Sequence, residues 1–367
     1  MADTTARAAR LERAAAATGS AGFDALVVPP SPDLAYLTGY APMPLERPTL
    51  LVVRPGRSPV LLVPALEHPL AAGSSASALV ELVSWSDGAD PYDAAAVLLP
   101  RSGRIAVGDE LWASHLLGLQ AAVAEGVFAS ASPVMGPLRA VKDTAELEAL
   151  RRAARAADEA FREICRTTFI GRREDQVAAD LASFLVGAGH ATADFTIVAS
   201  GPNAASPHHE PTGRTILPRD AVLLDFGGEL GGYFSDISRT VVVGEPPDGF
   251  EAVYELVRDA QDAAFRSVVP GVAAQEVDRA GRALIEEAGY GARFLHRIGH
   301  GIGMEVHEPP YLVEGNAWAL APGTTFSIEP GIYLEGAFGV RIEDIVAVTP
   351  DGAERLNRAT RDLQVVS

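Results

Sequence analysis

The sequence predicts two domains, an α/β domain over residues 1–135 followed by an α+β domain over residues 136–367. Three observations support this prediction. In the first third of the chain, short apolar runs alternate with helical stretches, which is typical of α/β domains. Pro133, Gly136 and Pro137 then interrupt regular structure and indicate a boundary. Beyond them strands and helices do not alternate strictly, which favours α+β over a doubly wound parallel sheet.

Composition indicates the class of protein. Apolar residues make up 48% of the 367 residues, enough for a sizeable core. The net charge of −18 argues against general binding to nucleic acid or anionic membranes, which requires basic patches. No apolar run approaches the ~20 residues of a membrane span. Residues 1–20 are charged and Ala-rich, as in an amphipathic helix rather than a signal peptide. We therefore expect a cytoplasmic protein that binds neither nucleic acid nor membranes.

In the first domain, the expected elements follow from hydrophobic periodicity. Short runs rich in Val and Leu predict strands over residues 23–30, 49–56, 59–65 and 103–110. Stretches rich in Ala and Leu predict helices over residues 92–99 and 112–125. The single cysteine, Cys165, excludes an intramolecular disulfide and is expected to be a buried structural thiol on a helix.

The second domain begins with a long helix. Asp143 and Glu146 have the spacing of a capping box, and the apolar periodicity that follows continues to about Phe169. Further helices are expected over residues 174–189, 249–268 and 274–289. Strands are expected over residues 194–200, 221–228, 233–243, 324–334 and 338–349.

Two of these strand pairs carry acids in apolar surroundings. Glycines flank Glu229 and Leu230, which is typical of a hairpin turn. With a four-residue loop from Glu229 to Gly232, the outward count places Asp225 opposite Asp236. In the second hairpin, a turn near Gly336 places Glu329 opposite Glu343 in the same way. Directly opposed residues share a face, with Cβ atoms roughly 5 Å apart.

These four acids predict a metal site. Burying an ionised carboxylate costs many kcal/mol unless a cation or a metal pairs with it. Arg341 and Arg239 could balance two of the acids, whereas a pair of divalent cations would balance all four. Oxygen-rich sites suit hard or borderline cations. A water shared by two such ions becomes a nucleophile near neutral pH, so the expected reaction class is metal-assisted hydrolysis.

The sequence resembles a known family at these positions. The order Asp225, Asp236, His300, Glu329 and Glu343 is similar to the five-ligand signature of the pita-bread metallopeptidases, which include prolidase and aminopeptidase P. The stretches HGIGMEVHE, SIEPGIY and VRIEDIV resemble the family's most specific motifs. The stretch GFDALVVPPSPDLAYLTGY resembles its creatinase-type N-terminal domain. The resemblance implies a pita-bread catalytic domain, preceded by a creatinase-like domain, and two divalent metal ions. Mn²⁺ is expected, with Co²⁺, Zn²⁺ or Fe²⁺ as alternatives.

The resemblance also implies a role for each ligand. Asp225 would bind one metal, His300 and Glu329 the other, and Asp236 and Glu343 would bridge the two. Glu329 would also carry a proton to the leaving nitrogen.

Other residues correspond to groups around the family's metals. Three histidines, His208, His296 and His307, match those that hold the scissile carbonyl and the tetrahedral intermediate. Arg341 would hold ligand carboxylates in place, and Tyr333 matches a tyrosine near the metals. His209 is expected at the surface, and the remaining histidines as structural or solvated residues: His68, His115 and His190.

The expected substrate is a short proline-containing peptide, cleaved by a homodimer. The extra N-terminal domain and the three substrate-facing histidines favour the prolidase and aminopeptidase P branch, which cleaves bonds before proline. Several prolidases carry an arginine near the position of Tyr311, where it binds the dipeptide carboxylate. Its replacement here keeps an Xaa-Pro aminopeptidase open as the alternative, although overall similarity favours an Xaa-Pro dipeptidase.

Two rival functions share this fold. One is a metal-dependent hydrolase or lyase that acts on a small osmolyte. The other is a metal-free peptide-binding platform, as in histone-chaperone relatives, which the intact ligand set disfavours. Metal analysis and a panel of peptide and osmolyte substrates would separate these functions from a peptidase.

Overall fold

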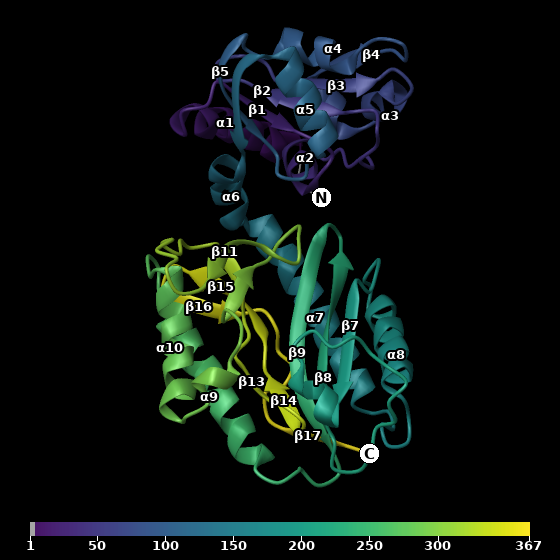
Figure 1. The fold of residues 1–367 in the computed structure, drawn as a ribbon, viewed down its shortest axis with the longest axis vertical. Helices are drawn as coiled ribbons and strands as arrows, with labels where there is room; N and C mark the ends of the chain where they lie inside the picture. The colour runs from purple at the N-terminus through teal and green to yellow at the C-terminus, as the bar shows by residue number, and fades with distance from the viewer. Residues whose placement is uncertain (1–3) are drawn as a thin grey trace. The chain divides into compact units, whose positions relative to one another are not determined.

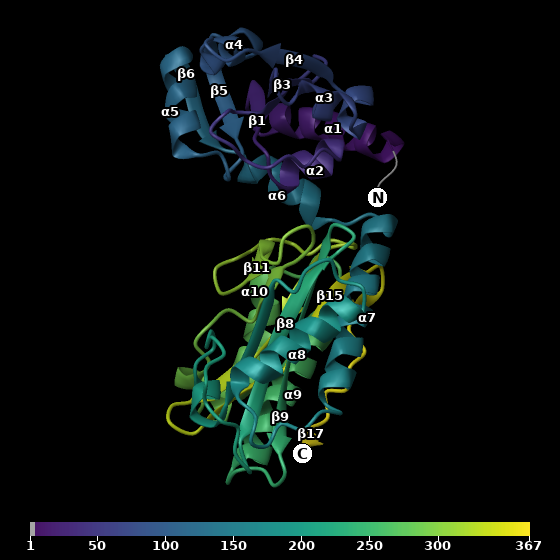
Figure 2. The same cartoon turned by 90° about the vertical axis from the view of Figure 1, so that its right-hand side faces the viewer.

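The computed structural model describes residues 4–367 and divides the chain into two compact units, Met1–Arg139 and Ala140–Ser367 (Figure 1). We call them the N-terminal unit and the C-terminal unit. Figure 2 shows both from a second direction. None of the helices formed by the described residues is long and apolar enough to cross a membrane.

The N-terminal unit is a mixed six-stranded sheet with helices packed on it. The strand order is β4-β3-β2-β1-β5-β6, and the pairs β1–β5, β5–β6 and β3–β4 are parallel. The strands are β1 (Ala25–Val28), β2 (Leu50–Val53), β3 (Val60–Pro64), β4 (Glu81–Trp85), β5 (Ser102–Val107) and β6 (Glu125–Ser130). The helices are α1 (Thr4–Ser20), α2 (Pro32–Thr38), α3 (His68–Ala72), α4 (Pro91–Leu98) and α5 (Ala113–Ala122), with a 3₁₀ turn at Ser75–Ala78. The predicted α/β organisation is confirmed. Strands β4 and β6 were not predicted, because they bury few side chains and so lack a clear apolar pattern.

The predicted break at Pro133, Gly136 and Pro137 is wrong, since all three lie inside helix α6 (Ser132–Ala140). Pro133 falls in the first helical turn, where its missing N–H would have no partner within the helix. Pro137 does remove one hydrogen bond. Burial of Val134 and Met135, which are 0% and 3% exposed, offsets that loss.

The C-terminal unit contains three sheets. Their strand orders are β17-β9-β8-β7, β11-β10-β12-β15-β16 and β13-β14. The strands are β7 (Phe195–Ser200), β8 (Ala221–Leu230), β9 (Tyr233–Val243), β10 (Gly299–Gly301), β11 (Glu308–Leu312), β12 (Thr325–Ile328), β13 (Gly331–Leu334), β14 (Phe338–Arg341), β15 (Asp344–Thr349), β16 (Gly352–Arg355) and β17 (Gln364–Val366). The helices are α7 (Thr144–Ile164), α8 (Glu174–Gly187), α9 (Phe250–Ser267) and α10 (Ala274–Glu287), with 3₁₀ turns at Gly201–Ala205 and Gly291–Arg293. Mixed helix and strand content of this kind agrees with the predicted α+β class.

Helix α7 begins as the sequence predicts. The Asp143 carboxylate accepts a hydrogen bond from the Glu146 backbone, and the Glu146 side chain accepts one from Asp143 N. The helix ends at Ile164, before the predicted Phe169. Cys165 therefore follows the last helical residue, where it is half-buried, and burial raises the pKa of its thiol to about 12.

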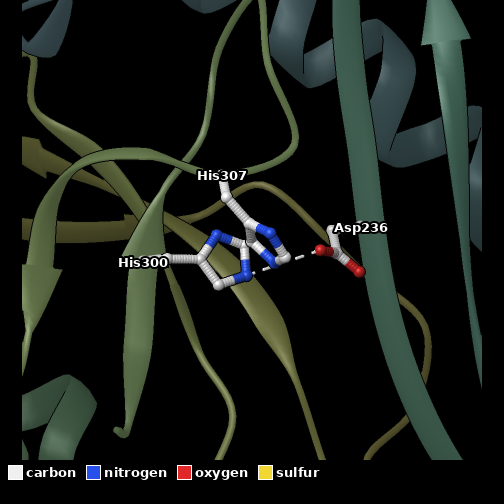
Figure 3. Close-up of side chains that lie close together, drawn as sticks. All are labelled: Asp236, His300 and His307. Carbon is white, nitrogen blue, oxygen red and sulfur yellow. Dashed lines mark ion pairs between the residues drawn. The ribbon is translucent and has the colours of Figure 1, made fainter. Parts of the chain in front are cut away.

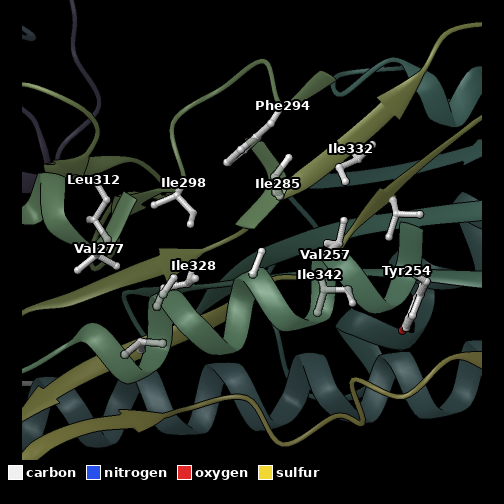
Figure 4. Packing of buried hydrophobic residues seen from close by; sticks show 14 of the residues in the cluster. Tyr254, Val257, Val277, Ile285, Phe294, Ile298, Leu312, Ile328, Ile332 and Ile342 are labelled. Carbon is white, nitrogen blue, oxygen red and sulfur yellow. The ribbon is translucent and has the colours of Figure 1, made fainter. Parts of the chain in front are cut away.

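Helices cover the sheets of the C-terminal unit on two sides. Helices α7 and α8 pack on the β7-β8-β9 sheet through a core that includes Val222, Leu224 and Phe226 of β8. Helices α9 and α10 pack on β10 to β15 through a second core (Figure 4). Because side chains alternate along a strand, Leu223 and Asp225 point away from α7 and α8. Leu223 instead packs near Tyr333 of β13, so this face of β8 is the inner one.

The register of the β8–β9 hairpin differs from the predicted one. Asp225 pairs with Ser238, and Asp236 pairs with Gly227. The loop consists of Gly231 and Gly232, whose φ angles of 66° and 90° form a tighter turn than the predicted four-residue loop. The resulting shift between partners is two residues. Since the side-chain period is also two, Asp225 and Asp236 still share the inner face.

The second hairpin has the predicted register but is interrupted. Glu329 and Glu343 were expected inside strands, and instead they lie where β12 passes into β13 and β14 into β15. Pro330 cannot donate to a ladder, which accounts for a break at this point. At the break, Glu329 N donates to Ile298 O at 2.7 Å and Glu343 N donates to Ser238 O at 3.0 Å. These bonds direct both acids toward neighbouring strands.

Candidate metal centre

The five predicted ligands converge on the inner face of the C-terminal unit. Their potential ligand atoms form overlapping groups in which all atoms lie within 4.8 Å of one another. His300 Nε2 lies 3.3 Å from Glu329 Oε1 and 3.6 Å from Asp236 Oδ2. The groups are Asp225–Asp236–Glu343, His300–Glu329–Glu343 and Asp236–His300–His307. The two hairpins therefore bring together acids that are about a hundred residues apart in the chain.

Electrostatics within the cluster favour bound cations. Burial, followed by the negative charge of Glu343, raises the pKa of Asp236 well above its usual range. Burial and then the charge of Glu329 raise the pKa of Glu343 in the same way. Burial raises the pKa of Glu329 itself to about 7, against the opposing effect of Arg341. Each carboxylate is thus costly to ionise in the protein alone.

Unpartnered oxygens provide a direct test of whether metals fit here. Within residues 4–367, three buried carboxylate oxygens accept no hydrogen bond: Asp225 Oδ1, Asp236 Oδ1 and Glu343 Oε1. Buried polar atoms of this kind are rare in folded proteins unless an ion or water satisfies them. A set of oxygen donors with one imidazole suits divalent cations such as Mn²⁺. The residues present therefore fit the metals implied by the sequence.

His300 is prepared to act as a neutral ligand. Burial lowers the pKa of its imidazole to about 3. Its Nδ1 lies 3.1 Å from the carbonyl oxygen of Gly301. Because a carbonyl only accepts hydrogen bonds, Nδ1 must carry the proton, which leaves the lone pair on Nε2. This atom is the one that faces Asp236 and Glu329.

Arg341 connects several residues of the site. Its guanidinium donates to Asp225 Oδ2 at 2.5 Å, to the Tyr333 hydroxyl at 2.8 Å and to Ser238 Oγ at 2.9 Å. Ser238 Oγ in turn donates to Glu343 Oε2 at 2.7 Å. Arg341 thereby orients Asp225 directly and Glu343 through Ser238, a contact that the sequence did not indicate.

Arg239 does not balance the cluster, contrary to the expectation from sequence. Its guanidinium pairs with Asp344 at 2.7 Å, and both side chains are 1% exposed. It also donates to the backbone carbonyls of Ala359 and Thr360. On β9 the odd-numbered residues face the side opposite Asp236, so the Arg239 side chain lies in the core, where it also donates to the Glu343 carbonyl.

The substrate-facing histidines predicted from sequence occupy different environments. His296 Nδ1 donates to Arg297 O at 2.8 Å, and its Nε2 lies 2.8 Å from the Tyr333 hydroxyl. Burial lowers the pKa of His296 to about 4, so its Nε2 is an acceptor for the tyrosine proton. Both nitrogens of His296 are therefore engaged within the chain, and a bond to substrate would replace one of them.

His307 and His208 are less enclosed. Both are exposed residues that line the same cavity. The His307 ring packs edge-on against the His300 ring, with centroids 4.1 Å apart (Figure 3). Burial, followed by the positive charge of Arg297, lowers the pKa of His307. Proximity to Asp236 and His300 also makes His307 a possible ligand by distance, which the sequence analysis did not anticipate.

The remaining histidines are held by local contacts. His115 stacks on Trp112, and His190 Nε2 lies 2.8 Å from Ser235 Oγ, so both are structural as expected. His68 is half-buried. His209 was expected at the surface but is half-buried, with Nε2 3.4 Å from the Glu174 carboxylate. The buried acid on α8 could not be placed beside it from sequence alone.

A cavity of about 680 Å³ opens over the cluster. All five predicted ligands line it together with Arg341 and the three histidines. Part of its wall is apolar and includes Phe195, Ile197, Pro207 and Val306. The volume is in the range of small-molecule sites. The cavity can therefore hold a small peptide with its reacting bond over the acids.

Arg297 is a site residue that sequence reasoning missed. Its guanidinium lies 4.2 Å from the centroid of the Tyr311 ring, and its side chain lines the cavity. Within residues 4–367, no carboxylate lies within ion-pair distance of Arg297. Sequence could have drawn attention to this residue, because it stands between two histidines of the motif, but not to its contact with Tyr311.

Comparisons with known proteins agree with this geometry. The sequence profile of metallopeptidase family M24 matches residues 148–350, and that of the creatinase/prolidase N-terminal domain matches residues 10–141. The chain is 44% identical to a probable dipeptidase PepE of Mycobacterium bovis, over 99% of this chain and 98% of that protein. It is 36% identical to an Xaa-Pro dipeptidase of Lactobacillus delbrueckii subsp. lactis, over 94% and 95%.

A solved structure shows the same fold. The crystal structure of dipeptidase PepE from Mycobacterium ulcerans superimposes with a TM-score of 0.96 at 43% identity, and the match covers 100% of this chain and 99% of that one. The fold, the motifs and the convergence of the acids thus lead to one conclusion. The chain belongs to metallopeptidase family M24, with a creatinase/prolidase N-terminal domain preceding the peptidase domain.

Proposed function

We propose that this protein is a dinuclear-metal-dependent peptidase that hydrolyses Xaa-Pro dipeptides. The observation that carries the proposal is the convergence of Asp225, Asp236, Glu343, Glu329 and His300 below a cavity large enough for a dipeptide. The names of its relatives support the same reading, since proteins 36% to 44% identical over nearly the whole chain are called dipeptidases or Xaa-Pro dipeptidases.

The metal-binding assignment extends the geometry. Asp225 would hold one ion, His300 and Glu329 the other, and Asp236 and Glu343 would bridge them. The three unpartnered carboxylate oxygens support this assignment. Two divalent cations held there, Mn²⁺ in our proposal, would activate water and polarise the scissile carbonyl.

Glu329 is the proposed proton carrier. Its carboxylate lines the cavity beside His300, where it would stand next to the attacking water. Ser327 Oγ donates to Glu329 Oε1 at 3.1 Å and orients the carboxyl group. From this position Glu329 would take a proton released by the attacking water and deliver it to the proline nitrogen that leaves.

The histidines and Arg341 would organise the substrate and the ligands. His307 and His208 face the cavity, and each would hydrogen-bond the oxygen of the scissile carbonyl as charge develops on it. His296, held by Tyr333 and Arg297 O, would line the site and keep Tyr333 in place. Arg341 would keep Asp225 correctly oriented.

Recognition of the carboxyl end of the substrate decides between a dipeptidase and an aminopeptidase. Tyr311 replaces the arginine that several prolidases use, yet the Arg297 guanidinium lies on the Tyr311 ring. Such stacking holds a guanidinium without neutralising its charge. We propose that Arg297 binds the free carboxylate of the dipeptide, which favours dipeptidase over aminopeptidase activity.

The proposal includes a setting for the enzyme. Its acidic composition, with a net charge of −18, suits a soluble protein of the cytoplasm. Its resemblance to peptidases whose N-terminal domain limits peptide length suggests a homodimer. Light scattering of the purified full chain would measure the oligomeric state, and a monomer at micromolar concentration would contradict the dimer.

A hydrolysis assay tests the central proposal. Protein stripped with EDTA is reconstituted with Mn²⁺, Co²⁺ or Zn²⁺ and assayed on Ala-Pro, Ala-Pro-Ala and a longer Xaa-Pro peptide. Ala-Ala serves as the control for the proline requirement. We expect metal-dependent turnover that is fastest on Ala-Pro. Faster cleavage of the longer peptides would assign the aminopeptidase alternative instead. No cleavage of any Xaa-Pro bond with any metal would contradict the proposal.

A further inference from the structure

A buried ion pair lies beside the candidate metal centre. Lys142 Nζ is 2.6 Å from Glu308 Oε1, and the two side chains are 1% and 2% exposed. Among the described residues that line the cavity, neither of the two appears. Removing two charges from water offsets most of their attraction, and apolar replacements of such pairs are often as stable. Stability alone therefore does not explain why the chain buries these two residues.

The lysine end of the pair is anchored to the sheet. Lys142 N donates to Gly323 O at 3.0 Å, and its neighbour Val141 forms an isolated bridge with Thr324, just before β12. Gly323 has a φ of 93°, and a Cβ there would lie 2.8 Å from Lys142 O. The backbone of Lys142 is thus fixed by close packing, so its ammonium group is presented from a rigid position.

The glutamate end closes a loop over the site. Glu308 pairs with Gly301 in the β10–β11 ladder, next to a bulge between His300 and Gly301. The Glu308 carboxylate also packs against Gly303, where a Cβ would lie 2.6 Å from Oε1. The carboxylate therefore joins the two ends of the loop over residues 303–308. Lys142 holds that carboxylate in place.

His307 lies inside this loop, directly before Glu308. Its ring rests edge-on against the His300 ring and near Asp236 (Figure 3). Within the described residues, no side-chain hydrogen bond holds the His307 imidazole itself. The orientation of this exposed ring therefore depends on the backbone on either side of it. That backbone is fixed through Glu308.

We propose that the Lys142–Glu308 ion pair is a positioning device that holds the imidazole of His307 over the candidate metal centre. The inference rests on the role proposed for His307 at the scissile carbonyl. Lys142 touches neither the substrate nor the reacting atoms, so it is a positioning residue that acts through Glu308. Loss of the pair frees the loop over residues 303–308 and lets the His307 ring leave its place against His300.

The experiment separates positioning from stability. The double variant Lys142→Met/Glu308→Leu removes both charges, so no unpaired charge remains buried. Lys142→Arg keeps the positive charge, and Glu308→Gln keeps the shape of the side chain without its charge. Each full-length variant is measured for metal content, thermal midpoint, kcat and KM on Ala-Pro. The His307 ring resonance is also recorded in the metal-free protein, assigned by comparison with His307→Asn.

We expect the double variant to change kcat and the His307 resonance but not the metal content or the thermal midpoint. The double variant should keep two metals per chain and a thermal midpoint close to that of the wild type. Its kcat should fall about 10- to 100-fold, with less than a threefold change in KM. The His307 resonance should move in the same variant. Lys142→Arg should retain kcat within about threefold, as expected if the charge on Glu308 is what matters.

Two outcomes would overturn the inference. The first is a folded double variant with wild-type kcat and an unmoved His307 resonance. The second applies if the double variant does not fold. In that case Glu308→Gln decides, and unchanged kcat and resonance in this variant reject the proposal. His307→Ala is measured in parallel. Wild-type activity in His307→Ala contradicts the proposed function of His307, whereas a loss there with full activity in the double variant rejects only the role of the ion pair.

Discussion

Arg341 donates a 2.5 Å hydrogen bond to the carboxylate of Asp225. Among residues 4–367 it is the one arginine or lysine that pairs with any of the four clustered acids. The acids of the two hairpins therefore outnumber their positive partners. In the metal-free protein this excess is relieved by protonation, and in the loaded protein by cations. The metal-free and metal-loaded proteins should therefore differ in how stability responds to pH and to loss of an acid.

Glu343→Gln should affect the metal-free and metal-loaded proteins in opposite directions. Without metal, the substitution removes a carboxyl group that must stay buried either ionised beside other acids or protonated far above its usual pKa, so the free energy of unfolding at pH 7.5 should rise by about 1–3 kcal/mol. With metal, a ligand is lost and bound metal should fall below two ions per chain. Urea unfolding with and without EDTA, together with elemental analysis, measures both effects. A metal-free variant less stable than the metal-free wild type would contradict the charge argument.

Metal-free protein should lose stability as pH rises through about 7. The pKa of Glu329 is raised to about 7 in the folded state, from an ordinary value of 4.5. The folded protein therefore binds more protons than the unfolded chain between these values, and stability falls with rising pH across that window. Urea unfolding of EDTA-treated protein from pH 5 to pH 8.5 measures this slope. Glu329→Gln is the control, and an equal slope in that variant would rule out Glu329 as its source.

Glu329→Gln should abolish most turnover while the fold is kept. Gln retains the acceptor for Ser327 Oγ, so the side chain can keep its position. It cannot carry a proton to the leaving nitrogen, and kcat on Ala-Pro should fall at least about 10²-fold. Circular dichroism and metal content establish that the variant is folded and loaded. Wild-type kcat would remove Glu329 from the role of proton carrier.

Arg297→Met should weaken discrimination for a free carboxylate. The wild type should cleave Ala-Pro with a lower KM than the amide Ala-Pro-NH₂, because Arg297 pairs with the carboxylate alone. In Arg297→Met the KM for Ala-Pro should rise about 10- to 100-fold, and the two substrates should become similar. Tyr311→Phe is the matched control, since it keeps the ring on which Arg297 lies. Unchanged preference for the free acid in Arg297→Met would assign the carboxylate to another group.

Arg239→Met should destabilise the fold more than it changes the metal site, because Arg239 contacts the backbone carbonyl of Glu343 and not its carboxylate. The Arg239–Asp344 pair is 1% exposed on both sides, but Arg355 and Arg361 also lie 3.3 Å and 3.8 Å from the Asp344 carboxylate, so loss of Arg239 should cost about 1–3 kcal/mol. The same substitution frees the carbonyls of Ala359 and Thr360, which Arg239 binds. Thermal unfolding would show a lowered midpoint, while kcat per folded molecule and metal content stay at wild-type values. A loss of bound metal at full stability would instead place Arg239 in the metal site.

The sequence was enough to identify the clustered acids because the prediction depended only on which face of a strand each side chain occupies. The predicted partner of Asp225 was wrong by two residues, and a shift of two preserves the face on which a side chain lies. The second hairpin kept its predicted register even though Glu329 and Glu343 lie outside its strands. Patterns with a period of two residues therefore survive errors in loop length that would mislead a prediction of exact pairing.

The features missed from sequence depend on contacts between distant segments. Stacking of Arg297 on Tyr311 and pairing of Arg239 with Asp344 join residues whose spacing shows no periodic pattern. Helix α6 was missed for another reason. Its prolines and glycine disfavour a helix locally, and only the tertiary burial of Val134 and Met135 compensates. Burial of this kind has no local signature.

The proposed ligands come from three separate segments of the chain, and this has a consequence for how the protein matures. Each hairpin supplies only one pair of acids, and His300 comes from a third segment. A nascent chain with one hairpin formed would hold no complete ion cage, so tight cation uptake must wait until all three segments have docked. The rate at which bound ion appears during refolding would then report the last assembly step of the C-terminal unit.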